Sequence, residues 1–336
     1  MRQFQRPFVR RAAAAVLLLI TIPLVTGCGL LGVVPPSPRS TFVFEDADRF
    51  RHVAARLASV TDSVALLDTG YVLKGSPGLH AYRARYPLSA QGLVAAIRQF
   101  REDYSRIGDR VQWLRARTDS LGLVIARYTR LVPTAVVLPV YFIVGEHHGV
   151  NSGSEVGPLL SVENGAARVS RPTVYELLAH EMTHIQQFSA VGLGRYRELY
   201  TSRPSLLGGV VREGIAEFFA ELVVGRVSQA AAQRYFRERE EDVWREFLGE
   251  LCRKDNGDWM GGRPSDPQRP SSVGYALGAA IARSFYASSA DKTAALKELL
   301  SSDDYPSILL RSGYPESRGT QRNDIEARLR GCTAGS

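Results

Sequence analysis

The chain has 336 residues, of which 45% are hydrophobic and 23% are charged, so it can bury one large core or two modest cores. Its formal net charge is +8, and removing four positive charges that lie in a basic N-terminal segment leaves +4. Acidic and basic residues are interspersed over 237–250, as on a solvated helix face. No basic stripe of the kind that follows a phosphate backbone is present, so we expect no nucleic-acid partner.

The chain begins with a basic segment and an apolar run that ends at a cysteine. Arg2, Arg6, Arg10 and Arg11 precede an apolar run over 12–25, which is too short for a comfortable membrane-spanning helix. The following Val25-Thr26-Gly27-Cys28 resembles the bacterial lipobox, which implies a lipoprotein signal peptide over 1–27 and a lipidated Cys28. This resemblance implies a lipid-anchored protein of the bacterial cell envelope, in the outer membrane and facing the periplasm or the cell surface. A simple anchor helix and an ordinary secretory peptide are the alternatives.

The remaining chain is predicted to be α+β and mostly helical. Residues 28–44 form a Pro/Ser-rich tether after the lipid, and apolar residues recur at three- and four-residue intervals through a helical N-terminal region over 45–130. Thr134 to Gly145 and Leu159 to Val162 have strand character. Further helices are expected at 207–224, 228–252, 273–288, 291–300 and 322–329.

His180-Glu181-Met182-Thr183-His184 is the pattern that carries chemistry, and it lies in a helix that begins near Thr173. Positions i and i+4 share one helix face, so His180 and His184 converge on one point, and Glu181 lies close enough to reach a metal-bound water. The pattern predicts one zinc ion held by the two histidines, with Glu181 as general base. A helix that carries two histidines by chance is the alternative.

A catalytic zinc site takes three protein ligands and keeps one position open. The metzincin motif needs glycine at position 187 and histidine at position 190, where this chain has Gln187 and Ala190. No histidine follows His184, so a carboxylate on a later helix is expected to complete the site.

Glu213-Gly214-Ile215-Ala216-Glu217-Phe218-Phe219 resembles the third-ligand helix of gluzincin metallopeptidases, including the aminopeptidase N-like group. It also resembles uncharacterised predicted zinc-dependent proteases and gliding-motility-type lipoproteins. The resemblance implies a zincin-like metallopeptidase domain over 131–290, with a small sheet, an active-site helix and Glu213 as third zinc ligand. A C-terminal helical extension over 291–336 follows. Gly214 is expected to let this helix approach the active-site helix, with Phe218 and Phe219 packing there.

Glu217 lies one turn after Glu213, so it is expected to accept the free N–H of a ligating imidazole. The alternative is a surface acid that pairs with Arg212 or with another base. The linker between His184 and Glu213 is longer than in the aminopeptidase N-like group, and we expect its segment from Gly192 to Gly208 to shape or cover the cleft.

Ser272 to Gly278 is similar to a helix found downstream of the site in the same relatives, which implies that Tyr275 directs its hydroxyl at the tetrahedral intermediate. Packing through Gly274 and Gly278 is the alternative.

Two further pairs of residues leave alternatives open. His147 and His148 are adjacent, so they point in different directions and are expected to line a cleft rim or face water rather than bind a second metal. Cys252 and Cys332 either pair in an oxidising compartment or stay as free thiols.

These observations predict a membrane-anchored zinc-dependent peptidase that hydrolyses peptide bonds with a metal-activated water. Its partners would be the membrane, through lipidated Cys28, and a peptide or protein substrate, whose extended chain is expected to add to the strand over Thr134 to Gly145. The alternative is a zinc-binding envelope lipoprotein that serves as a non-catalytic assembly or interaction factor. The natural substrate, the bond specificity and the oligomeric state stay open.

Overall fold

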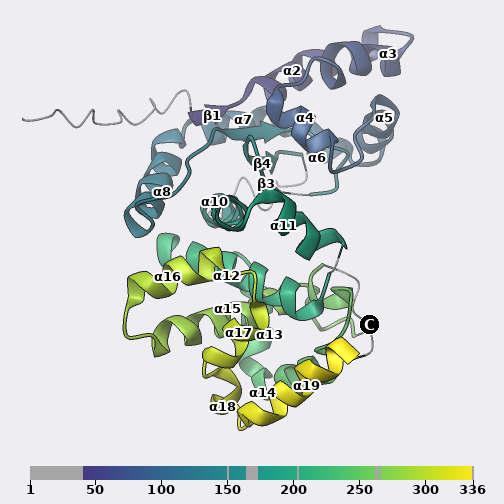
Figure 1. Ribbon diagram of the computed structural model, residues 1–336. Coiled ribbons are helices and arrows are strands. Elements are labelled where there is room, and N and C mark those ends of the chain that lie inside the picture. The colour runs from purple at the N-terminus through teal and green to yellow at the C-terminus, as the bar shows by residue number, and fades with distance from the viewer. Residues whose placement is uncertain are drawn as a thin grey trace, which may run out of the picture. The chain divides into compact units, whose positions relative to one another are not determined.

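The computed structural model describes residues 41–149, 151–163, 173–202, 204–261, 264 and 266–334. These residues belong to one compact unit in which helices surround a small sheet (Figure 1), so the predicted α+β, mostly helical fold class is confirmed. The predicted signal peptide over 1–27 and Cys28 lie outside the described residues. Within the described part of the chain, no helix combines the length and the apolar character needed to cross a membrane.

Four short strands form one mixed sheet in the order β1-β2-β4-β3. β1 and β4 run parallel to β2, and β3 runs antiparallel to β4. β2 and β4 are buried along their whole length, as expected for apolar strands that are covered on both faces. The strand bounds are Phe42–Val43 for β1, Val140–Ile143 for β2, Ser152–Ser154 for β3 and Gly157–Ser161 for β4.

The strand predicted over Thr134 to Gly145 is only partly right, because only β2 joins the sheet. The backbone before it is bound by the long helix α10 (Thr173–Val191): the Gln186 side chain accepts from the N–H of Val136 at 2.7 Å and donates to its carbonyl at 2.9 Å. β2 lies between β1 and β4, so both of its edges are already paired. The expectation that substrate adds to this strand is therefore wrong. β1 also lies inside the range 28–44, so the predicted tether ends before Phe42.

The predicted helical N-terminal region is present as a series of short helices. Local caps delimit several of them: the Ser76 side chain accepts from the N–H groups of Gly78 and Leu79, and Pro77 occupies the first turn of α4. Both α2 and α4 contact β2, and α8 contacts α10 (Figure 1). The bounds are α2 Glu45–Ala54, η1 Leu57–Ser59, α3 Ser63–Leu67, η2 Asp68–Val72, α4 Pro77–Arg83, α5 Ala90–Gln99, α6 Arg101–Ser105, α7 Ile107–Arg115 and α8 Thr118–Leu131.

Three long helices build the centre of the molecule. α10 packs against β3 and β4 and against α12 (Leu206–Val224), which in turn packs along α15 (Val273–Ser288). A Cβ atom on Gly214 would lie 2.0 Å from the carbonyl carbon of Gly278, so these two glycines allow α12 and α15 to touch through their backbones. Gly214 was expected to serve the contact with the active-site helix, and this was wrong. Phe218 and Phe219 likewise pack on Tyr286 of α15 and Tyr128 of α8.

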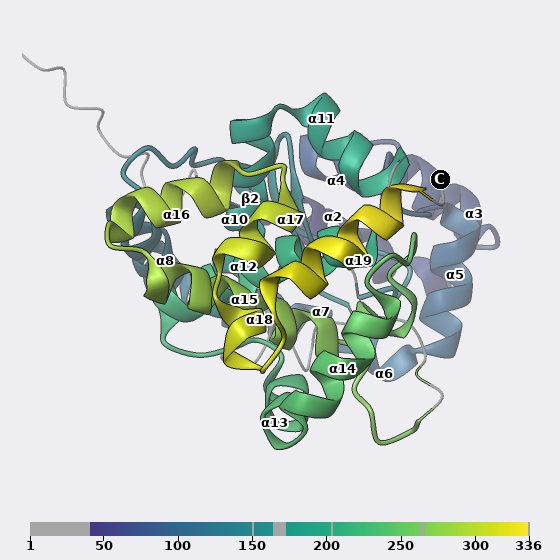
Figure 2. The same cartoon turned by 60° about the horizontal axis from the view of Figure 1, so that its bottom comes forward.

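Shorter helices complete the C-terminal half (Figure 2). The single helix predicted over 228–252 is instead two helices, because Arg239 leaves the helical conformation with φ −135° and ψ 29°. The core is continuous through the ranges 45–130, 131–290 and 291–336, whose boundaries stay predictions. The bounds are α11 Leu193–Arg197, η3 Glu198–Ser202, α13 Ala230–Glu238, α14 Glu240–Glu250, η4 Gly257–Trp259, α16 Lys292–Ser301, α17 Tyr305–Arg311, α18 Tyr314–Ser317 and α19 Arg322–Ala334.

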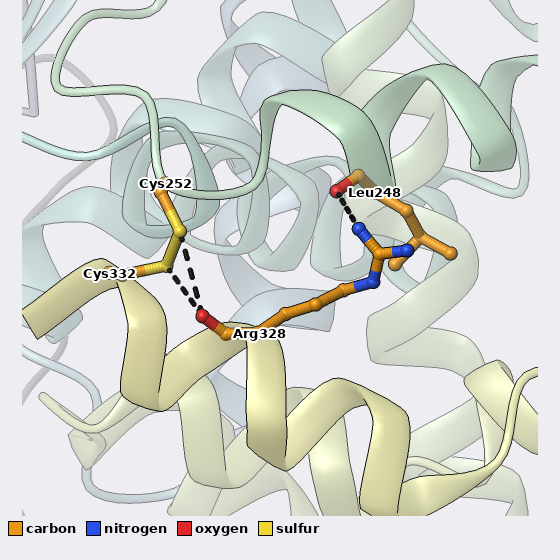
Figure 3. Close-up of a disulfide and its surroundings, with 4 residues drawn as sticks. All are labelled: Leu248, Cys252, Arg328 and Cys332. Carbon is orange, nitrogen blue, oxygen red and sulfur yellow. Dashed lines mark hydrogen bonds between the residues drawn. A yellow bond between two sulfur atoms is a disulfide. The ribbon is translucent and has the colours of Figure 1, made fainter.

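A disulfide joins Cys252, just after α14, to Cys332 in α19 (Figure 3). This selects the paired state from the two alternatives for these cysteines. The carbonyl oxygen of Arg328 lies 3.6 Å from the Cys252 sulfur and 3.3 Å from the Cys332 sulfur. Because disulfide sulfurs carry no hydrogen, these are packing contacts. The Arg328 guanidinium also donates to the carbonyl of Leu248 at 3.2 Å, so α19 is held to α14 at two points.

Candidate metal centre

The site begins with α10, which carries both histidines on one face. The side chains of His180 and His184 are buried, and their Nε2 atoms lie 3.0 Å apart. Met182 and Ile185 on the same helix are buried in the core, so the helix cannot rotate without exposing them. Helix periodicity and core packing therefore fix the direction in which the two imidazoles point.

Glu213 reaches the same point from α12. Its Oε2 atom lies 3.2 Å from Nε2 of His180 and 3.1 Å from Nε2 of His184. Bonds of about 2.0–2.1 Å in a tetrahedral zinc site place neighbouring donor atoms roughly 3.3 Å apart, close to these separations. The three side chains form a buried group that can hold a metal ion, as the sequence pattern requires.

Glu217 orients the first histidine. One of its oxygens lies 3.0 Å from Nδ1 of His180, and the carboxylate also accepts from the hydroxyl of Ser228 at 2.5 Å and from the Ser228 N–H at 3.3 Å. The side chain is only 1% exposed, so the alternative of a surface acid paired with Arg212 or another base is wrong. Its contact with Nδ1 directs the lone pair of His180 Nε2 toward the centre.

Gln187 orients the second histidine. Its Oε1 atom lies 2.8 Å from Nδ1 of His184, and its Nε2 donates to the backbone carbonyl of Arg212 at 3.1 Å. The Tyr196 hydroxyl lies 3.3 Å from the same Nδ1. A glutamine amide oxygen only accepts, so Nδ1 carries the proton and Nε2 presents a lone pair.

Three lone pairs therefore converge, two from imidazole nitrogens and one from a carboxylate. Such an arrangement is repulsive unless a cation or a shared proton lies between the donor atoms. Burial alone would lower the pKa of His180, but hydrogen bonds to Glu213 and Glu217 outweigh it and raise this pKa well above its ordinary value. Burial would raise the pKa of Glu213, whereas the adjacent His184, His180 and Arg212 hold it well below its ordinary value. The donors thus favour a bound positive charge, and two imidazoles with one carboxylate suit zinc.

Glu181 lies beside the metal-binding group and under β3. It is 4% exposed, and burial raises the pKa of its carboxyl, although the neighbouring imidazoles of His180 and His184 act in the opposite direction. A Cβ atom on Gly153 would lie 2.9 Å from the Glu181 carbonyl oxygen and 3.0 Å from Cβ of His184. Glycine at this position thus allows the edge strand to run directly over the active-site helix.

A cleft with a volume of about 950 Å³ opens onto these residues. Part of its lining comes from α4, from Arg85 just after that helix and from Gly153 of β3, and another part comes from Tyr196 and Tyr200 of the α11–η3 segment. The linker from Gly192 to Gly208 therefore contributes to the cleft, as expected. At the rim, Glu155 pairs with Arg85 at 2.5 Å and with Arg197 across the opening. Arg85 also donates to the carbonyl of Gly153 at 2.8 Å.

The other candidates separate into cleft and packing residues. Tyr275 lines the cleft with its ring centroid 6.1 Å from that of His180, and Gly274 and Gly278 pack against neighbouring backbone, so the packing expected of this helix is present and the role of the Tyr275 hydroxyl stays a prediction. His147 stacks on Phe100 with centroids 3.6 Å apart and bonds Asp103 at 2.8 Å. Neither His147 nor His148 lines the cleft, and of the two expected positions, a cleft rim or a place facing water, His148 takes the second, since its side chain is 42% exposed.

Sequence reasoning missed four residues of the centre: Gln187, Tyr196, Arg212 and Ser228. Gln187 has a local signal, since position i+3 from His184 lies on the same helix face. Ser228 and Tyr196 come from loops and short helices whose path the sequence does not fix. Arg212 adjoins Glu213 and had been considered only as a partner for Glu217.

Comparison with known proteins gives one family. The model of the family described as predicted Zn-dependent protease (DUF2268) matches residues 146–303, a range that includes all three members of the metal-binding group. No curated protein and no solved structure matches the chain significantly. The description of the matching family therefore supports a zinc protease, and it names no substrate.

Proposed function

We propose that the protein is a zinc-dependent peptidase in which His180, His184 and Glu213 bind one zinc ion and Glu181 is the general base. The observation that carries this proposal is the convergence of two imidazole lone pairs and one carboxylate oxygen, all within 3.2 Å of one another, at the floor of an open cleft. The family similarity over 146–303 supports the same reaction class.

A bound zinc ion would lower the pKa of a water molecule and polarise a substrate carbonyl. The remaining task of the protein side chains is then to accept and return protons. Glu181 adjoins His180 on the helix and is buried, so its carboxylate is held beside the reacting atoms and takes a proton from water. Burial raises the pKa of Glu181 above its ordinary value, which makes its carboxylate a stronger base toward water, and the protonated carboxyl can then return the proton to the leaving amine.

The cleft suits an extended peptide. β3 is an edge strand, and its Gly153 lines the cleft together with Glu181. The backbone of a substrate can therefore pair with β3, rather than with the inner strand β2. The carbonyl of Gly153 is bonded to Arg85, and a substrate that pairs there displaces this hydrogen bond. Tyr275, which lines the same cleft close to His180, is the residue we propose for stabilising the tetrahedral intermediate.

The proposal extends to the location of the enzyme. The segment Val25-Thr26-Gly27-Cys28 supports lipidation at Cys28, and the disulfide between Cys252 and Cys332 is consistent with an oxidising compartment such as the bacterial cell envelope. A peptidase anchored in this way acts on substrates outside the cytoplasm.

The test is hydrolysis of a broad peptide and protein pool by the zinc-loaded full chain, compared with two variants. Glu181→Gln is expected to keep zinc and lose turnover. Glu176→Gln is the matched control, because Glu176 is a buried glutamate of the same helix that bonds Arg226 and does not line the cleft. A zinc-loaded wild type that cleaves no member of the pool contradicts the enzymatic claim and leaves a metal-binding envelope factor. Equal turnover in wild type and Glu181→Gln contradicts the assignment of the base.

A further inference from the structure

The residue beside the third ligand is a fully buried cation with no role in the function proposed above. Arg212 is 3% exposed, and its Nη2 donates to Oε1 of Glu213 at 3.2 Å. The other oxygen of Glu213, Oε2, is the one that faces the two histidines. The two carboxylate oxygens of Glu213 are therefore engaged on opposite sides, one by arginine and one by the metal-binding group.

The guanidinium of Arg212 is held in place by tyrosines of the linker. Its central carbon lies 3.6 Å from the ring centroid of Tyr200 and 5.7 Å from that of Tyr196. The two tyrosine rings are parallel within 5°. A planar guanidinium that stacks on an aromatic face loses freedom to rotate, so its N–H groups stay directed at Glu213.

Residue 212 also reaches the second histidine through its backbone. Its carbonyl accepts from Gln187, whose amide oxygen bonds Nδ1 of His184. One residue thus contacts Glu213 directly and His184 through a single intermediate. If Arg212 only neutralised the charge of Glu213, its second contact, through Gln187 to His184, would have no purpose.

We infer that Arg212 is a positioning residue of the metal centre, which holds Oε1 of Glu213 so that the carboxylate presents a single oxygen to the ion. This inference rests on the metal binding of the proposed function. A carboxylate that offers one oxygen leaves a four-coordinate site with one position for water, whereas a carboxylate that offers both raises the coordination number. Arg212 therefore keeps the fourth position available to water.

Coordination number is a better readout than affinity. Removing Arg212 takes a positive charge away from the ion, which strengthens metal binding, but it also frees Glu213 to reorient, which weakens it. These two effects have opposite signs. Cobalt(II) placed in the site separates them, because four-coordinate cobalt absorbs visible light much more strongly than five- or six-coordinate cobalt.

The experiment is the visible spectrum of the full chain loaded with cobalt(II). Arg212→Met is expected to lose at least about half of the wild-type absorption intensity per bound cobalt, as Glu213 becomes able to offer both oxygens. Arg110→Met is the matched control, since Arg110 is equally buried at 3% exposure and bonds Asp103 and backbone carbonyls remote from the metal-binding group. Its spectrum should equal that of the wild type. An unchanged spectrum in Arg212→Met overturns the inference.

A second pair of variants tests the inference independently if Arg212→Met does not fold. Tyr200 is 45% exposed, so Tyr200→Ala removes the stacked ring with little cost to the core. It is expected to lower the cobalt absorption part of the way, while Tyr200→Phe, which keeps the ring, leaves it unchanged. A wild-type spectrum in Tyr200→Ala overturns the inference. A wild type that binds neither cobalt nor zinc contradicts the proposed function instead, so the two failures are distinguishable.

Discussion

Replacing Glu217 by glutamine tests how much this carboxylate of α12, which contacts His180, contributes to metal binding. The carboxylate is 1% exposed and lies 3.0 Å from Nδ1 of His180, while Ser228 holds it from the other side. Glu217→Gln keeps the shape but converts a charge-assisted hydrogen bond into a neutral one, which costs about 1–2 kcal/mol. Loss of the negative charge near a cation acts in the same direction. At roughly 1.4 kcal/mol for each factor of ten, we expect zinc affinity to fall about tenfold to a hundredfold.

The assay is competition for zinc between the full chain and a chromophoric chelator. Glu221→Gln is the control, because Glu221 lies one turn further along α12 and pairs with Arg283 at a partly exposed position. It should leave zinc affinity unchanged. The reasoning is refuted if Glu217→Gln binds zinc within about twofold of the wild type, or if both variants lose affinity equally.

Three further predictions concern stability, measured by denaturant unfolding. Replacing Cys252 and Cys332 together by serine is expected to lower the free energy of unfolding by about 2–4 kcal/mol, because the disulfide closes a long loop with a sequence separation of 80. Gly214→Ala is expected to cost about 1–3 kcal/mol, since its Cβ would lie 2.0 Å from the backbone of Gly278; an unchanged midpoint would contradict this close approach. Burial raises the pKa of Glu163, so its ionisation in the folded state opposes folding as pH rises above the ordinary glutamate range. Glu163→Gln should therefore exceed the wild type in stability at pH 7 and lose this advantage in acid; a constant difference across pH would contradict the argument.

The parts of the fold that follow from local rules could be predicted. The helix expected at 273–288 is α15, and the helix expected at 207–224 differs from α12 by one residue at its start. Apolar periodicity and a serine cap at Ser205 are properties of the segment itself. Tertiary contacts determined the rest: the backbone at Val136 has strand character in sequence, yet the Gln186 side chain binds it to α10.

The metal centre likewise has one part that local sequence predicts and another that depends on tertiary contacts. The histidine pair and Glu181 depend on helix geometry alone, so their placement together follows from the sequence. Glu213 joins them from a distant helix, and only resemblance to a known motif indicated it. The direction of Gly214 toward α15 depends on the packing of three helices, which no local pattern encodes. Arg212 and Gln187 likewise gain their contacts from the crossing of α10 and α12.

The zinc content of the full chain, measured for wild type and Glu213→Ala, tests the central claim most directly. We predict one zinc ion per chain in the wild type and almost none in Glu213→Ala, because two neutral imidazoles alone bind zinc weakly. Glu221→Ala is the control on the same helix and should keep the ion. A wild type that holds no zinc, or a Glu213→Ala variant that holds as much as the wild type, would contradict the account.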